Sequence, residues 1–231
     1  MTSPKPQKTI GTLQERSLHA KLKEIYKQPG DQLEVSVGKF VIDIVRDDLL
    51  IEIQTRNFSA IKNKLMQLLK DHKIMLVYPI PKVKWIVRET PDGSSVISRR
   101  KSPKRLDFID VFRELVRIPR ILRHSNFSLE LILIEEEQVL CQDGKGSWRR
   151  KGWSVTDRKL VEIIDRKLLS APSDLLDILP KDIPNQFTNK DLAELAKITR
   201  NLAQKITYCL RQLGVINLDG KQGRSHLFKI E

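Results

Sequence analysis

The feature that most constrains the fold of this chain is a pair of β-rich runs, residues 39–46 and 49–54, joined by Asp47 and Asp48. Two such runs separated by two polar residues predict an antiparallel β-hairpin. A hairpin alone is at best marginally stable in water, so its apolar face must be covered by other elements. The neighbouring sequence should therefore supply helices and further strands.

Elements of both kinds are predicted around the hairpin, in the order α-β-β-β-α-β over residues 12–86. Apolar residues at helical spacing predict one amphipathic helix over 12–26 and a second that ends near Asp71. A short strand at 33–35 precedes the hairpin, and the apolar run 74–78 is typical of a buried strand. We therefore expect an α/β (α+β) fold in which helices flank a mixed sheet.

The hairpin places two acidic residues opposite each other. With a symmetric two-residue turn, Asp43 lies across from Glu52, and Gln54 points to the same face. Opposed carboxylates in a half-apolar sheet repel each other and are costly to desolvate. A divalent cation removes this conflict, because Mg²⁺ prefers carboxylate oxygens and is usually held by one or two of them together with phosphate and water. The alternative is a register shifted by one residue, or a face at an exposed edge where acids are harmless.

This arrangement resembles the core of the PD-(D/E)xK nuclease superfamily, the fold of many restriction enzymes and repair nucleases. The shared pattern is an opening helix, an aspartate on one strand, Glu-x-Lys on the next, and then a helix and a strand, and it covers roughly residues 12–86. The resemblance implies a restriction-endonuclease-like sheet and Mg²⁺ (or Mn²⁺) bound by Asp43 and Glu52. It also implies four catalytic positions: Asp43, Glu52, Gln54 and, on the opening helix, Glu15.

The chain departs from the superfamily pattern at two positions: Ile42 replaces the proline before the aspartate, and Gln54 stands where lysine is expected. A glutamine can position a water molecule but brings no charge. Lys62 or Lys64 on the following helix either supplies a displaced positive charge or belongs to a solvated face. Glu15 also has two interpretations, because it closes a Thr-x-x-Glu capping-box pattern.

The middle of the chain contains a basic segment. Residues 91–105 include Pro, Gly and Ser and predict an exposed loop, followed by a helix over 106–117 and a strand over 127–134. Trp148 and Trp153 surround three basic residues and either stack on bases or anchor a loop in the core. The basic side chains of the loop either bind phosphate or are simply solvated. They are Arg99, Arg100, Lys101, Lys104 and Arg105.

The C-terminal part, residues 156–231, predicts a winged helix-turn-helix domain. Thr188 is the expected N-cap of a short helix, a longer helix follows over 200–213, and Gly214 ends it. A hairpin with a polar tip at 219–226 completes the order of elements. The predicted contacts to DNA are side chains of types that bind phosphates and base edges. They are Arg200, Asn201, Gln204, Lys205, Tyr208, Arg211, Lys221 and Arg224.

Composition favours a polyanionic partner. The 42 Lys and Arg against 29 Asp and Glu give a net charge of +13, and residues 197–229 alone hold 7 basic and 1 acidic side chains. Two distant cysteines and the lack of a membrane-length apolar run predict a cytoplasmic protein without membrane contacts. We expect a flexible N-terminus over 1–11, a nuclease-like domain over 12–155 and the winged helix over 156–231.

The sequence therefore predicts a DNA-processing protein: a Mg²⁺-dependent endonuclease that a winged helix delivers to DNA. The alternative is a non-enzymatic DNA-binding regulator whose degenerate nuclease-like domain acts in homodimerisation or partner binding. A winged helix that binds protein also stays open. So does an RNA nuclease or RNA-binding factor, because basic surfaces do not distinguish the two polymers.

Overall fold

The structure, a computed structural model, describes residues 17–144, 146, 148 and 151–231. The N-terminus expected to be flexible over 1–11, and residues 12–16 of the expected opening helix, among them Glu15, lie outside these ranges.

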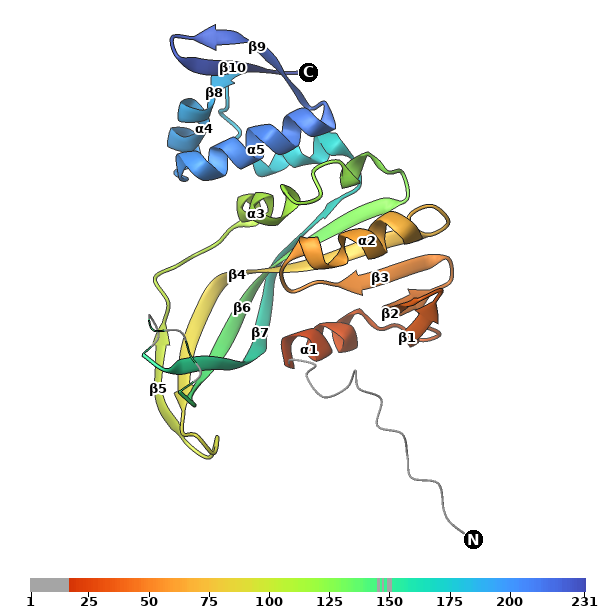
Figure 1. The fold of residues 1–231 in the computed structure, drawn as a ribbon, viewed down its shortest axis with the longest axis vertical. Coiled ribbons are helices and arrows are strands. Elements are labelled where there is room, and N and C mark those ends of the chain that lie inside the picture. The colour runs from red at the N-terminus through yellow and green to blue at the C-terminus, as the bar shows by residue number, and fades with distance from the viewer. Residues whose placement is uncertain (1–16, 145, 147, 149–150) are drawn as a thin grey trace.

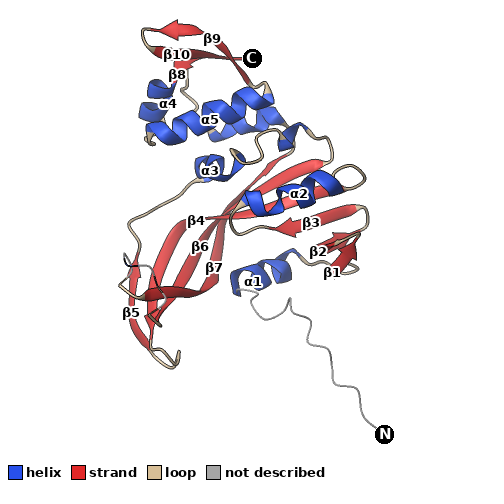
Figure 2. Ribbon diagram, viewed as in Figure 1, coloured by secondary structure: helices blue, strands red, loops and turns tan. Residues whose placement is uncertain are grey.

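A mixed, seven-stranded sheet forms the centre of the molecule (Figures 1 and 2). Its strands are β1 (Gln32–Val37), β2 (Phe40–Arg46), β3 (Leu49–Ile53), β4 (Lys73–Glu89), β5 (Val96–Lys101), β6 (Phe127–Gln142) and β7 (Trp153–Leu169). The order is β1-β2-β3-β4-β6-β7, and β5 pairs with the far part of β4. The β3–β4 and β4–β6 pairs are parallel and the other pairs are antiparallel, so the predicted mixed sheet is confirmed.

Helices cover both faces of this sheet. The helix α1 (Ser17–Tyr26) packs its apolar stripe against one face, in a core cluster with Ile44 and Ile51. The helix α2 (Phe58–Leu68) and the short α3 (Phe112–Leu115) pack on the other face. The element order α-β-β-β-α-β predicted for this region is confirmed over the described residues.

The hairpin has the predicted register. Ile44 pairs with Ile51, Val45 with Leu50 and Arg46 with Leu49. Beyond these pairs, the backbone N–H of Ile53 donates to the Asp43 side chain (2.8 Å). The Asp43 carboxylate therefore accepts a backbone hydrogen bond from β3 at the point where β2 and β3 separate.

The sequence predicts a strand over 74–78 that Pro79 closes and further β character over 84–88, but the break between them is wrong, because β4 continues through Pro79 and Pro81 to Glu89. Its pairing with β3 extends only to Val77, and its pairing with β5 begins at Trp85. Between these points β4 has only β6 as a sheet neighbour, so prolines that lack an N–H are tolerated.

Three further predictions for the middle of the chain need correction. Part of the loop expected over 91–105 is β5, and the helix expected over 106–117 is reduced to the 3₁₀ turn η2 (Phe108–Val111) and α3. The domain boundary expected between residues 155 and 156 falls inside β7, which pairs with β6. All six side chains of β5 are exposed, and the apolar residues of β7 are interrupted by charged ones, so no continuous apolar run marks either strand.

The C-terminal unit consists of two helices and a small sheet. Its elements are the 3₁₀ turn η5 (Pro172–Ile178), β8 (Gln186–Thr188), α4 (Asn189–Leu195), α5 (Arg200–Leu213), β9 (Ile216–Gln222) and β10 (Ser225–Ile230). The strands have the order β8-β10-β9. Thr188 caps α4 as predicted, with Asp191 completing a capping box, and Gly214, at a φ of 73°, ends α5.

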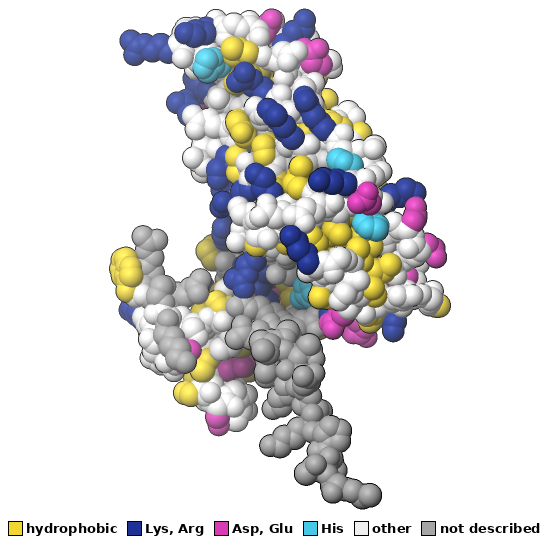
Figure 3. Space-filling model, turned by 45° about the vertical axis from the view of Figure 1, so that its right-hand side comes forward, with side chains coloured by type: hydrophobic (Ala, Val, Ile, Leu, Met, Phe, Trp, Pro, Cys, Tyr) yellow, Lys and Arg dark blue, Asp and Glu magenta, His cyan; other side chains and the backbone are white. Residues whose placement is uncertain are grey.

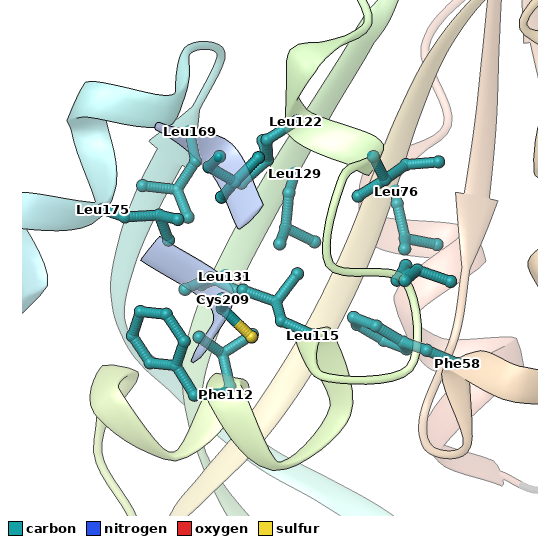
Figure 4. Packing of buried hydrophobic residues seen from close by; sticks show 14 of the residues in the cluster. Phe58, Leu76, Phe112, Leu115, Leu122, Leu129, Leu131, Leu169, Leu175 and Cys209 are labelled. Atoms are coloured by element: carbon teal, nitrogen blue, oxygen red, sulfur yellow. The ribbon is translucent and has the colours of Figure 1, made fainter. Parts of the chain in front are cut away.

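One buried core joins this unit to the large sheet. In Figure 4, Phe112 and Leu115 of α3 lie beside Cys209 of α5. Leu169 and Leu175 lie on the other side of Cys209 from Leu115. All five side chains are at most 2% exposed. The two parts of the molecule are therefore packed together by side chains rather than only tethered by the chain. None of the described helices is both long enough and apolar enough to span a membrane.

Candidate active site

Four charged or titratable side chains meet where β2 and β3 separate. Asp43 comes from β2, Glu52 from β3, His19 from α1 and Lys64 from α2. Each of the two acids contacts a basic side chain that a helix supplies. The hairpin therefore provides the acids and the flanking helices provide their partners.

Glu52 is a buried carboxylate with only one of its oxygens engaged. Its exposed fraction is 8%, and its Oε1 accepts a hydrogen bond from Lys64 Nζ at 2.6 Å. Its Oε2 is buried and has no hydrogen-bond partner within the described residues. Burial and the charge of Asp43 raise the pKa of Glu52 to about 7, although Lys64 and the nearby backbone of Asp43 act in the opposite direction.

Asp43 is held in the ionised form. Its Oδ2 accepts the N–H of Ile53 and lies 3.2 Å from His19 Nε2. Burial alone would raise the pKa of Asp43, but His19, the Ile53 amide and the charge of Lys64 outweigh it and hold this pKa below its usual value. The two neighbouring carboxyl groups thus have pKa values shifted in opposite directions, a pattern found at sites of acid–base and metal chemistry.

Lys64 rather than Lys62 joins the site. Its ammonium group donates to Glu52 and also to the backbone carbonyl of Val41 at 2.5 Å. Its side chain is 14% exposed, whereas Lys62 is on the exposed side of α2. A positive charge near the acid pair is therefore present, but it comes from the helix and not from the strand position that Gln54 occupies.

Gln54 follows Glu52 at the end of β3 and is bonded mainly to its own loop. Its Nε2 donates to the carbonyls of Arg56 and Asn57, and its backbone N–H donates to Val77. The amide nitrogen therefore fixes the turn between β3 and α2, which leaves only the amide oxygen to act on a water molecule.

The sequence reasoning gave His19 no role, and the structure places it against Asp43. One signal could have found it. His19 stands four residues after Glu15, a spacing that puts two side chains on the same face of a helix. The carboxylate proposed on that helix face would therefore have predicted an active-site position for His19 as well.

The acid pair is suited to a hydrated cation rather than to a closed protein cage. Within the described ranges, no group of three or more His, Cys, Asp or Glu side chains is arranged to hold a metal ion. Two carboxylates are nevertheless the usual protein contribution to Mg²⁺, because water and substrate phosphate fill the remaining positions. The unpartnered Oε2 of Glu52 is an oxygen ligand of the required kind.

The basic residues predicted in the middle of the chain lie on and after β5, away from the acid pair (Figure 1). Arg99 stacks on Trp85, with its guanidinium 3.8 Å from the ring centre, and pairs with Glu137. The other four are exposed: Arg100, Lys101, Lys104 and Arg105. Trp148 is 83% exposed, and Trp153 is half-buried beneath the guanidinium of Arg88.

The residues predicted to contact DNA in the C-terminal unit lie on α5, near the end of β9 and in the turn between β9 and β10. Lys205 is half-buried and the other seven are exposed: Arg200, Asn201, Gln204, Tyr208, Arg211, Lys221 and Arg224. Among the described residues, none of the basic side chains in this set forms an ion pair. Figure 3 shows Lys and Arg side chains distributed over this end of the molecule.

Comparison with known proteins places the large sheet in a family. A family model described as "Domain of unknown function (DUF8091)" matches residues 16–170. The chain belongs to this family. The DUF8091 match begins one residue before α1 and ends one residue after β7, so it coincides with the large sheet and its helices.

A relative extends the similarity beyond the DUF8091 region. An uncharacterized protein of Treponema pallidum (strain Nichols) is 32% identical over 224 residues, which are 96% of this chain and 88% of the relative. No solved structure matches the chain.

Proposed function

We propose that the protein is a metal-dependent nuclease that hydrolyses phosphodiester bonds in DNA, with Asp43 and Glu52 as the metal ligands. The observation that carries this proposal is the buried, unpartnered Oε2 of Glu52 beside a second carboxylate. An unsatisfied carboxylate oxygen in a dry site is costly for a purely structural sheet. Coordination of a divalent cation satisfies that oxygen and removes the repulsion between the two acids.

The bound cation would polarise a phosphodiester and lower the pKa of an attacking water. The residues of the chain prepare the site for it. His19 and the Ile53 amide keep Asp43 oriented and ionised, and Lys64 holds one oxygen of Glu52 so that the other stays available. Lys64 also places a positive charge beside the acid pair, where it can attract a phosphate group.

The arrangement of elements supports the proposed superfamily. The order α-β-β-β-α-β, the mixed sheet and the location of the acids where two strands separate agree with a restriction-endonuclease-like core. The order β8-α4-α5-β9-β10, with a three-stranded sheet, similarly supports a winged helix. Its exposed, unpaired basic residues on α5 are suited to phosphate contacts.

A plasmid-cleavage assay tests the proposal. Supercoiled plasmid is incubated with the protein and Mg²⁺ or Mn²⁺, in parallel with the double variant Asp43→Asn/Glu52→Gln. Cleavage that requires the metal and disappears in the double variant supports the proposal. Equal cleavage by both proteins shows that this site is not responsible.

The second candidate is a DNA-binding regulator without nuclease activity. Gln54 favours it, because this residue brings no charge and its amide nitrogen is engaged by the loop carbonyls. A salt-sensitive gel shift without cleavage in either metal would support this candidate. Competition between duplex DNA and RNA in the same gel shift would show which polymer is preferred.

A further inference from the structure

We infer that a second site, separate from the acid pair, binds an alkyl chain that carries an anionic head group. The site is a cavity of about 400 Å³ between α2 and the segment 118–124, which includes the 3₁₀ turn η3 (Ile121–Arg123). This volume lies within the range of small-molecule pockets. None of its lining residues belongs to the candidate active site, so the inference does not depend on nuclease activity.

The floor of the cavity is apolar and aliphatic. Leu69, Ile118 and Ile121 are at most 5% exposed and line it together with Pro119. Met66 forms one wall and is 53% exposed, a large exposed fraction for an apolar side chain next to a cavity. The lining contains no Phe, Tyr or Trp on which a nucleobase could stack, so the surface fits an alkyl chain better than a nucleotide.

The rim of the cavity is basic. Lys62, Arg120, Arg123 and His124 line it, and no acidic residue does. Among the described residues, none of these four forms an ion pair; Arg120 donates instead to the neutral side chain of Gln212 at 2.9 Å. Three of the four are exposed, so a charged head group could be bound at the edge while the chain fills the floor.

The cavity also lies at the contact between the two parts of the molecule. Arg120 contacts Gln212 near the end of α5, and Arg123 Nη2 would be only 3.1 Å from a side-chain carbon at Gly214. Figure 3 shows hydrophobic side chains beside Lys, Arg and His side chains on the middle of the molecule. Charge complementarity at the rim and an aliphatic floor together specify the ligand class: an alkyl carboxylate, phosphate or sulfonate, either in solution or as part of an anionic lipid.

Binding of decanoate to the full-length protein, measured by calorimetry, tests this inference, with decanol as the uncharged control. Wild type and Met66→Leu should bind decanoate equally. Met66→Glu should bind it at least about tenfold more weakly, because it places a carboxylate in the wall, and decanol should likewise bind about tenfold more weakly than decanoate. Lys181→Glu, an exposed charge reversal between η5 and β8, should bind like wild type and serves as the matched control.

The two sources of the ligand are distinguished by adding vesicles that contain phosphatidylglycerol. Cosedimentation that Met66→Glu weakens supports a lipid acyl chain in the cavity, whereas decanoate binding without cosedimentation supports a soluble ligand. The inference is overturned if decanol binds as tightly as decanoate, or if Met66→Glu binds both decanoate and vesicles like wild type. Circular dichroism of each variant confirms that the fold is intact.

Discussion

The acid pair and the surface of α5 carry charge in opposite ways. Asp43 and Glu52 are largely buried, lie close enough for the charge of Asp43 to raise the pKa of Glu52, and are each contacted by a basic side chain. The basic residues of α5 are mostly exposed and form no ion pairs within the described residues. Burial creates the shifted pKa values that reactive groups need, whereas exposure leaves a phosphate-binding surface accessible to a polyanion. The difference indicates that the acid pair is suited to catalysis and the surface of α5 to binding a polyanion.

Neutralising either residue of the acid pair should have the largest effect, because it removes a charge on which the proposed chemistry depends. Asp43→Asn or Glu52→Gln should reduce the single-turnover cleavage rate by at least about 100-fold, because each removes one anionic metal ligand. DNA affinity in a gel shift should not change. Asp48→Asn, in the exposed turn of the same hairpin, is the matched control and should cleave normally. A rate for Glu52→Gln equal to that of wild type would contradict the proposed role.

The shared core predicts that both regions unfold together. Phe112 is fully buried where α3 packs on α5. Phe112→Ala should lower the free energy of unfolding by about 3–5 kcal/mol, the usual cost of removing a buried ring. Urea denaturation followed by circular dichroism should show a single transition at a lower midpoint. Two separate transitions in the wild type would instead mean that the regions are independent.

The pH dependence of the free energy of unfolding should show the effect of burial on Glu52. The folded-state pKa of Glu52 is raised from 4.5 to about 7, so its ionisation is unfavourable in the folded protein. Its contribution to stability is therefore complete below about pH 4.5 and is lost as the pH rises through 7. Between pH 5 and pH 8, Glu52→Gln should gain up to about 2 kcal/mol in unfolding free energy relative to wild type. If the unfolding free energies of the two proteins changed with pH in parallel, burial would not raise the pKa of Glu52.

The smallest effects are expected on the surface of α5. Arg200→Ala and Arg211→Ala should each weaken DNA binding by up to about tenfold, and each should reduce the slope of log affinity against log salt by about one. The cleavage rate of bound DNA should stay the same. Lys190→Ala, which removes an exposed side chain of α4, is the matched control. Fluorescence anisotropy across a salt series measures both quantities, and unchanged slopes would remove α5 from the DNA interface.

Local sequence patterns predicted the part of the fold where apolar periodicity is strong. The hairpin register followed from a two-residue turn, and the cap at Thr188 and the end at Gly214 followed from residue type alone. The strands β5 and β7 were missed because β5 is exposed throughout and charged residues interrupt the apolar ones of β7, so their pairing with β4 and β6 determines their structure. The full length of β4 was missed because two prolines are tolerated only where one of its neighbours is absent.

In the candidate site, too, local sequence predicted some residues, and tertiary contacts determined the others. Asp43 and Glu52 could be paired from the sequence because they lie on one hairpin. Lys64 and His19 come from helices on opposite faces of the sheet, and only the tertiary fold determines which side chains of a helix reach the acids. The side-chain bonds of Gln54 to its own loop could not be predicted either, because they depend on the path of residues 55–57.

Binding of Mn²⁺, measured from its electron paramagnetic resonance signal at pH 8, tests the central claim most directly. Wild-type protein with a bound DNA oligonucleotide should take up Mn²⁺ at the acid pair. Asp43→Asn/Glu52→Gln should lose this binding, and Asp48→Asn should keep it. Identical Mn²⁺ titrations for wild type and the double variant would show that Asp43 and Glu52 do not bind the cation, which would contradict the proposed nuclease site.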